Sequence, residues 1–282
     1  MPAIRVVTDS ACDLPDDLLA EHGIGLVPLR IRFGDKEYVD REELPTDQFW
    51  LKARSFHGLP QTSAPSPGQF RTEFERLADE GARGVVCVDL SSKMSATIQS
   101  ARQAAKDLEG RLPVQVVDSL SVTLGLGLQV LVAAEAAEAG KGMDEVVEAV
   151  VAAQSRLSVY GALDTLENLR HGGRIGGAQA LIGSMLSIKP VIEVRGGEVA
   201  QESKQRTRGR CLRYLAQKVR DFGPLGRLAV SHADAPDFDQ FMGLLEGVKA
   251  DRPTVTASIG PVIGSHAGPG AVGVAMLAPA PQ

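Results

Sequence analysis

One histidine of the chain lies in a segment whose composition suits anion binding. His266 belongs to residues 260–273, which read GPVIGSHAGPGAVG and contain five glycines and two prolines. Glycine lets a ligand approach the main chain and proline stiffens turns, so this composition predicts a rigid loop that presents the imidazole among backbone N–H groups. Because an imidazole can donate a hydrogen bond to a carboxylate or a phosphate, the segment predicts a receptor for a small anion. A tight turn with an incidental histidine is the alternative.

Two further segments carry hydroxyl groups where an anion could bind. Residues 61–67 read QTSAPSP and place Thr62 and Ser63 in a stiff loop before a predicted helix. Residues 91–97 read SSKMSAT and place Ser95 and Thr97 between an apolar strand and the next helix. Ligands of open α/β sheets bind beyond the carboxyl ends of strands, where helix N-termini offer free N–H groups. Both segments therefore suit anion binding, whereas the alternative is that the hydroxyls simply cap helices.

Positive charge is concentrated in two places in the second half of the chain. Arg174 follows two glycines in the segment HGGRI, where a flexible backbone could aim a guanidinium at a ligand. Residues 204–210 read KQRTRGR and include Arg206 and Arg208. We interpret these three arginines as candidate contacts for a phosphate or an acidic partner. For the cluster, the alternative is a solvated helix start.

Several classes of function are not supported by the sequence. The chain has no GxxxxGK[S/T] phosphate-binding loop, no GxSxG nucleophile elbow and no HExxH zinc motif, and its three cysteines lack metal-ligand spacing. Its net charge of -5 argues against nucleic-acid binding. No apolar run reaches the roughly 18 residues that cross a bilayer. The first residues already have the pattern of a β-strand and lack the apolar segment of a signal peptide. We therefore expect a cytoplasmic protein without a resident cofactor or metal.

The elements that must position these side chains alternate between short apolar strands and helices. This alternation is typical of βαβ units and predicts an α/β fold with mostly parallel sheets. The 282 residues suffice for two domains, which we place at 1–157 and 158–282. Turn sequences at 34–35 and 196–197 predict two hairpins, and residues 178–186 are predicted to be helical. The predicted strands are 4–8, 25–33, 36–40, 84–90, 114–117, 159–163, 190–195, 198–204, 227–231, 255–259 and 272–277.

Taken in chain order, these segments resemble the DegV family. VTDS (7–10) resembles the opening strand of the family, TSAPS (62–66) its hydroxyl-bearing loop, and SSKMSAT (91–97) its SSKLSGT. HGGRI (171–175) is similar to its KGGRI, and residues 260–273 to its GPVIGTHxGPGA. The match covers nearly the whole chain. Departures fall at Met94, Ala96, His171 and Ser265, of which His171 removes a fixed charge near Arg174.

The resemblance implies two α/β domains with a ligand tunnel at their interface, which buries a long-chain fatty acid such as palmitate, stearate or oleate. It implies a role as the fatty-acid-binding subunit of a bacterial fatty acid kinase, in which a separate subunit binds ATP and phosphorylates the carboxylate. The chain would then be a carrier and not itself an enzyme, with the kinase subunit as its partner and an acyltransferase as a further candidate partner. The implied ligands of the carboxylate are Thr62, Ser63, Ser95, Thr97 and His266.

Two other functions remain open from the sequence. An acyl-transfer enzyme would use Ser95 as nucleophile and His266 as base, although no acidic residue is obviously placed to orient the histidine. A regulatory module that binds a small anion, such as a sugar phosphate, would use the same donors, because a fold does not fix a function. A co-purified fatty acid would favour the carrier, and a bound sugar phosphate the regulatory module.

Overall fold

The N-terminal half is built on a four-stranded parallel sheet in this computed structural model, which describes residues 2–181 and 188–281. The strand order is β2 (Gly25–Val27), β1 (Ile4–Asp9), β6 (Gly84–Asp89) and β7 (Val114–Asp118). Every residue of β6 is buried, and its sequence GVVCVD is apolar up to the final aspartate, as expected for a parallel strand covered on both faces. The three pairings are parallel, which confirms the predicted orientation for this half.

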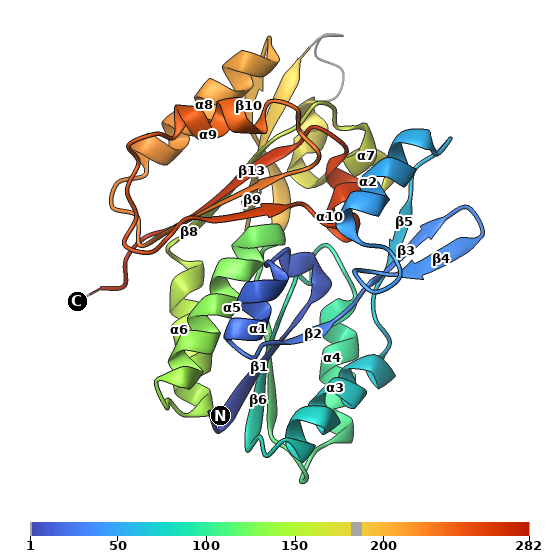
Figure 1. Cartoon of the computed structure of the whole chain (residues 1–282), viewed down its shortest axis with the longest axis vertical. Coiled ribbons are helices and arrows are strands. Elements are labelled where there is room, and N and C mark those ends of the chain that lie inside the picture. Colours follow the sequence, from blue (N-terminus) through green and yellow to red (C-terminus); the bar gives the residue numbers. More distant parts are fainter. Residues whose placement is uncertain (1, 182–187, 282) are drawn as a thin grey trace.

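Helices cover both faces of this sheet (Figure 1). On one face lie α3 (Pro67–Asp79) and α4 (Thr97–Asp107), and on the other α5 (Thr123–Glu138) and α6 (Met143–Gln154). Ser66 begins α3 with a capping box that it forms with Gln69. A 3-10 helix, η1 (Ser10–Cys12), and α1 (Asp16–Glu21) follow β1.

A small antiparallel sheet extends from this half beside α2 (Thr46–Ser55) (Figure 1). Its strands are β4 (Lys36–Val39), β3 (Arg30–Phe33) and β5 (Gln61–Ser63). The hairpin predicted at Gly34 is confirmed, and the φ of 59° at Gly34 favours glycine. The single strand predicted over residues 25–33 is wrong, because β2 and β3 belong to different sheets. Pro28 lies at the break, where it offers no N–H to a continuous ladder.

The C-terminal half is built on a six-stranded mixed sheet. Its order is β10 (Glu198–Gln205), β9 (Lys189–Arg195), β8 (Leu157–Ala162), β13 (Val272–Leu277), β11 (Arg227–His232) and β12 (Val255–Ser258). The α/β class is confirmed, but mostly parallel strands are a wrong prediction for this sheet, because within the described residues only β11 and β12 pair in parallel. The reason is that β9 and β10 form the predicted hairpin and β13 enters between β8 and β11. The helix α9 (Phe238–Leu244) is the crossover that joins the parallel neighbours.

Shorter elements complete this half. The helix α8 (Arg208–Asp221) lies with α9 on the outer face of the sheet, while α7 (Glu167–His171) and α10 (Pro261–Ala267) lie toward the N-terminal half (Figure 1). The helix predicted at 178–186 is the 3-10 helix η2 (Gly176–Leu181) in its described part, and its other residues lie outside the described chain. Across the described ranges, no helix combines the length and the apolar character that a bilayer span requires.

Helix α5 joins the two halves, since it packs on β1 and β6 of the first sheet and on β11 and β13 of the second. It is apolar around its circumference, and Leu124, Leu126 and Leu128 are fully or almost fully buried. Gly125 permits the close approach of β8, because a Cβ there would lie 2.5 Å from Val159 Cγ2. One hydrophobic core therefore spans both sheets. The division into domains at 157/158 stays a prediction.

Candidate functional site

The segment around His266 is a short helix rather than the predicted loop. Gly260 is the N-cap of α10, Pro261 occupies the first turn, and Gly268, with a φ of 76°, ends the helix. The glycine content suggested a loop, but a helix of two turns is stable here because it packs on the N-terminal half. Gly264 allows that packing, since a Cβ there would lie 2.7 Å from the Trp50 ring. His266 lies in the last turn of α10.

His266 meets Thr62 across the two halves. The Thr62 Oγ1 and His266 Nε2 atoms are 2.9 Å apart, and Thr62 lies on β5. Burial and the neighbouring Arg174 charge lower the pKa of His266 to about 4, so the imidazole is neutral near pH 7. Its other nitrogen, Nδ1, has no hydrogen-bond partner among the residues that the structure describes. A neutral imidazole can donate from one nitrogen and accept at the other.

The two glycines before Arg174 bring its guanidinium beside this pair. Gly172 lies against the imidazole, because a Cβ at residue 172 would be 2.3 Å from His266 Nδ1. Gly173 has a φ of 71° and turns the chain. Arg174 then donates from Nε to the Met94 carbonyl at 2.9 Å and from Nη1 to the Gly172 carbonyl at 2.6 Å. The flexibility inferred from the sequence is thus used to place a cation near His266.

Ser95 and Thr97 form a pair at the start of α4. Their hydroxyl oxygens are 2.8 Å apart, and the Thr97 N–H donates to Ser95 Oγ at 3.2 Å. Ser95 therefore accepts from the first N–H of α4, which is close to the alternative in which these hydroxyls cap a helix, although the N-cap residue itself is Ala96. Ser95 also lines the cavity described next, whereas Thr97 is fully buried and is not among the lining residues.

An apolar cavity of about 180 Å³ lies between the two halves. Its polar wall is made of hydroxyl, imidazole and guanidinium groups from Thr62, Ser63, Ser95, Arg174 and His266. The rest is mainly aliphatic, with Leu29, Leu90 and Val122 from one half and Leu163, Ile192 and Val194 from the other. Cys12 and Cys87 are buried elsewhere. A ligand with a long apolar chain and one polar end matches this distribution.

A second, more polar hollow adjoins the first. It is lined by residues 58–62, Asn168, His171 and Gly172, and it shares Thr62, Arg174 and His266 with the apolar cavity. These three side chains therefore separate the two spaces. A group bound by them would be approachable from the second hollow.

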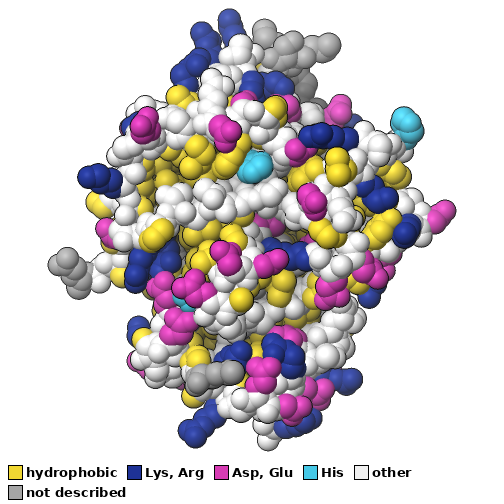
Figure 2. Space-filling model, in the orientation of Figure 1, with side chains coloured by type: hydrophobic (Ala, Val, Ile, Leu, Met, Phe, Trp, Pro, Cys, Tyr) yellow, Lys and Arg dark blue, Asp and Glu magenta, His cyan; other side chains and the backbone are white. Residues whose placement is uncertain are grey.

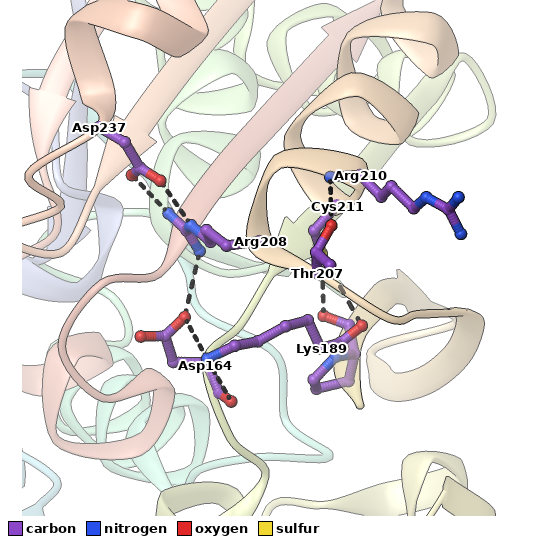
Figure 3. A network of polar contacts seen from close by, with 8 residues as sticks. Asp164, Lys189, Thr207, Arg208, Arg210, Cys211 and Asp237 are labelled. Atoms are coloured by element: carbon purple, nitrogen blue, oxygen red, sulfur yellow. Dashed lines mark hydrogen bonds and ion pairs between the residues drawn. The ribbon is translucent and has the colours of Figure 1, made fainter. Parts of the chain in front are cut away.

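The basic cluster at 204–210 divides into different roles. Arg208 donates from Nε and Nη2 to the Asp237 carboxylate at 2.8 and 2.9 Å, and its Nη1 lies 3.6 Å from Asp164 (Figure 3). Lys189 pairs with the same Asp164 at 3.1 Å. Arg208 is thus held inside a charge-balanced network, while Arg206 is exposed. Neither arginine lines the two cavities, so the structure does not bring them together with His266.

Four buried carboxyl groups of the N-terminal half were not predicted from the sequence. Asp9, Asp13, Asp40 and Asp89 are almost fully buried in the N-terminal half. Burial raises the pKa of Asp9 and Asp40 to about 7 and that of Asp13 to about 6. Asp9 and Asp89 are the last residues of the adjacent strands β1 and β6. In the sequence, each of these aspartates ends an apolar run, and this pattern could have indicated that the two carboxyl groups are buried. In the described chain, no group of three or more His, Cys, Asp or Glu side chains is arranged to hold a metal ion.

Two sheets joined by a shared helix, with an apolar cavity that ends in polar groups, define an α/β protein with an interior site between its halves. The chain belongs to the DegV family, whose model, described as an uncharacterised protein family, matches residues 3–278. A DegV domain-containing protein of Streptomyces coelicolor is 37% identical over 275 residues, which are 96% of this chain and 97% of that protein. The family resemblance is confirmed.

Solved structures of similar proteins share this fold. One, reported for fatty acid binding of a DegV family protein from Thermus thermophilus, has 33% identity and a TM-score of 0.88 over 99% of this chain and 100% of that one. Another, a DegV lipid binding protein from Thermotoga maritima, has 26% identity and a TM-score of 0.87 over 97% and 98% of the two chains. The aligned residues include both sheets of this chain.

Proposed function

We propose that this chain binds a long-chain fatty acid in the apolar cavity and presents its carboxylate to a separate ATP-dependent kinase. The observation that carries the proposal is an aliphatic cavity whose one polar wall contains Thr62, Ser95, Arg174 and His266. The similar Thermus thermophilus protein, which is described as binding a fatty acid, supports it. Palmitate, stearate and oleate are the candidate ligands.

The head group needs donors because an unpaired buried carboxylate is costly. Thr62, Ser63 and Ser95 supply hydroxyl groups, and His266 supplies one N–H. Because His266 is neutral near pH 7, the compensating positive charge comes from Arg174. Thr97 acts through Ser95 rather than on the ligand. The acyl chain contributes roughly 0.8 kcal/mol for each buried CH₂, so most of the affinity comes from the aliphatic walls.

The second hollow is the route by which a phosphate donor would reach the carboxylate. It meets the apolar cavity at Thr62, Arg174 and His266, and the chain carries no phosphate-binding loop of its own. The kinase subunit would supply ATP from this side, and an acyltransferase would receive the acyl phosphate afterwards. A cytoplasmic location is part of this proposal, since ATP is available there. Arg206 remains a candidate contact for the kinase.

The two alternative functions fit the geometry less well. For acyl transfer, Ser95 Oγ bonds Thr97 rather than His266, and a histidine with a pKa of about 4 is a weak base at pH 7. A small anion would bind only at the polar wall and would leave the aliphatic part of the cavity empty.

The test is native mass spectrometry of the purified protein, followed by extraction of any ligand. We expect a mass increase equal to one fatty acid, and after delipidation we expect rebinding of palmitate or oleate but not of a sugar phosphate. Incubation with ATP and magnesium should yield acyl phosphate only when the partner kinase is added. A bound sugar phosphate, or acyl phosphate made by the chain alone, would contradict the proposal.

A further inference from the structure

One buried carboxylate of the N-terminal half reaches the helix that carries His266. Asp13 is 3% exposed, and its Oδ1 accepts a hydrogen bond from the Gly260 N–H at 2.9 Å. Gly260 is the N-cap of α10. The contact therefore joins the first turn of α10 to a residue 247 positions away in the sequence.

The backbone on both sides is adapted to this contact. Asp13 has a φ of 52° and a ψ of 18°, a left-handed conformation that aspartate tolerates better than most residues. Gly260 has no side chain where the carboxylate lies, since a Cβ there would be 2.7 Å from Asp13 Oδ1. The carboxylate thus occupies the position that a residue 260 side chain would take. It also satisfies one of the N–H groups that a helix start leaves unpaired.

Helix α10 is so short that the position of its first turn determines the position of His266 in its last turn. It has seven residues, so it depends on tertiary contacts for its stability. At about 1.5 Å per residue, His266 lies roughly 9 Å along the axis from Gly260. The Trp50 indole N–H donates to the Ile259 carbonyl at 3.1 Å and holds the preceding residue. A shift of the first turn would therefore carry His266 away from Thr62.

The other buried carboxyl groups make different contacts. Asp9 accepts from the N–H groups of Ala11 and Leu90, and Asp89 accepts from the Cys87 thiol. Among the contacts of the described residues, these two remain within the N-terminal half. Asp13 is the carboxylate of this group that crosses to α10.

We propose that Asp13 is a positioning residue for the carboxylate site, which acts by fixing the first turn of α10 so that His266 meets Thr62. This inference rests on the proposed function insofar as His266 binds the fatty acid. Asp13 touches neither cavity. Its effect on the ligand must therefore pass through α10.

The test uses Asp13→Gly, because glycine accepts the left-handed backbone while it removes the carboxylate. Asp13→Asn keeps an acceptor oxygen and is the rescue variant. Asp234→Gly is the matched control, since Asp234 has a φ of 51° and its described ion pair is with Arg54 rather than α10. Gly260→Ala disturbs the same contact from the other side and serves if Asp13→Gly does not fold.

The first readout is the NMR titration of the His266 imidazole, assigned by comparison with His266→Ala. In the wild type, Asp13→Asn and Asp234→Gly we expect the ring to stay neutral to about pH 4. In Asp13→Gly and Gly260→Ala we expect titration to move toward the usual value of about 6.5, because the ring leaves its buried place beside Arg174. Unchanged titration in these two variants, or a shift in Asp13→Asn as large as in Asp13→Gly, would overturn the proposal.

The second readout is palmitate affinity in a double-mutant cycle. We expect Asp13→Gly to weaken binding about tenfold, and to have no further effect when His266 is already alanine. Equal weakening in both backgrounds would show that Asp13 does not act through His266. Wild-type affinity of His266→Ala would contradict the proposed head-group site, while the imidazole titration would still test Asp13 on its own.

Discussion

At the residue scale, the site depends on glycines that leave space for polar side chains of other segments. Gly172 leaves space for the His266 ring, and Gly260 leaves space for the Asp13 carboxylate. In both cases a side chain from one segment fills the position that a Cβ of another would occupy. The sequence shows the glycine, but it does not show which distant side chain occupies the space beside it.

Replacement of Gly172 tests this packing. Gly172→Ala would place a Cβ 2.3 Å from His266 Nδ1, so the ring must leave the position in which it meets Thr62. We expect fatty acid affinity to fall by about 1–3 kcal/mol, the cost of a disturbed hydrogen bond to a charged group. Isothermal titration calorimetry measures it. Gly243→Ala in α9, where a Cβ meets nothing within 4 Å, is the control and should bind as the wild type. Normal affinity of Gly172→Ala would show that the ring is not needed.

The buried Asp40 predicts an unusual pH dependence of stability. Burial raises the pKa of Asp40 from 3.8 to about 7 in the folded state. Between these values the folded protein binds more protons than the unfolded chain, so this group makes the protein more stable as the pH falls from 7 toward 4. Asp40→Asn removes the titration and should therefore raise the melting temperature at pH 8.

Thermal unfolding at pH 8, 6 and 5 checks this expectation. The advantage of Asp40→Asn over the wild type should shrink as the pH falls. Asp35→Asn, at an exposed position in the β3–β4 turn, is the control. An advantage of equal size at all three pH values would mean that proton uptake by Asp40 is not its source.

At the element scale, the predictable part of the fold is the part made by local patterns. The buried run of β6, the capping box of α3 and both hairpin turns are readable from the sequence, and the structure has them. Strand orientation in the second sheet was not predictable, because β13 pairs with β8 across more than a hundred residues. Helix α10 was missed for a related reason, since its stability comes from contacts with Trp50 and not from its own glycine-rich sequence.

The candidate site was predictable as a set of residues but not as a geometry. Thr62, Ser95, Arg174 and His266 all line one cavity. Their surroundings were not predictable: the bond to Thr62, and the burial and the Arg174 charge that keep His266 neutral, depend on tertiary structure. The role of Arg208 in an internal network could not be read from its place in a basic cluster.

A buried hydrogen bond links the β9–β10 hairpin, which lines part of the cavity, to the N-terminal half. Ser91 Oγ donates to the Gly197 carbonyl at 2.6 Å, and the hairpin carries the lining residues Ile192 and Val199. Ser91→Ala should loosen the hairpin, so amide exchange in β9 and β10 and the release of bound fatty acid should both become faster. Hydrogen–deuterium exchange with mass spectrometry measures the first effect.

Ser119→Ala is the control for this variant. Ser119 is also buried, but its hydroxyl donates within its own loop to the Ser121 carbonyl. Its exchange in β9 and β10 should equal that of the wild type. If Ser91→Ala matched this control, the hydrogen bond would not hold the hairpin.

At the scale of the whole molecule, the surface offers a test of kinase docking. Positive and negative side chains are intermixed on the face shown in Figure 2. The electrostatic effect of one exposed arginine on a docking partner is therefore reduced by acidic side chains on the same face. If the proposed kinase docks here, Arg206→Glu should leave fatty acid binding intact and slow phosphorylation by that kinase, most strongly at low salt. Arg102→Glu, a reversal at an exposed position on α4, is the matched control. If both variants were phosphorylated at the same rate, Arg206 would not contact the kinase.

The shared core predicts how the molecule unfolds. Because α5 packs on both sheets, one hydrophobic core is shared by the two halves, in addition to a smaller core within each half. We expect one cooperative thermal transition, with equal calorimetric and van't Hoff enthalpies, in spite of the two sheets. Differential scanning calorimetry measures both enthalpies. Two separate transitions would instead support independent domains at 1–157 and 158–282.

The position of β13 also has a consequence for how the protein is made. This strand is the last along the described chain, yet it lies inside its sheet between β8 and β11. On the ribosome, β8 must therefore wait for its neighbour while the intervening chain is synthesised, which takes about 5 to 20 s at about 5–20 residues per second. During that time the face of α5 that β13 will cover is open to water. We therefore expect the nascent chain to expose this apolar face until β13 emerges.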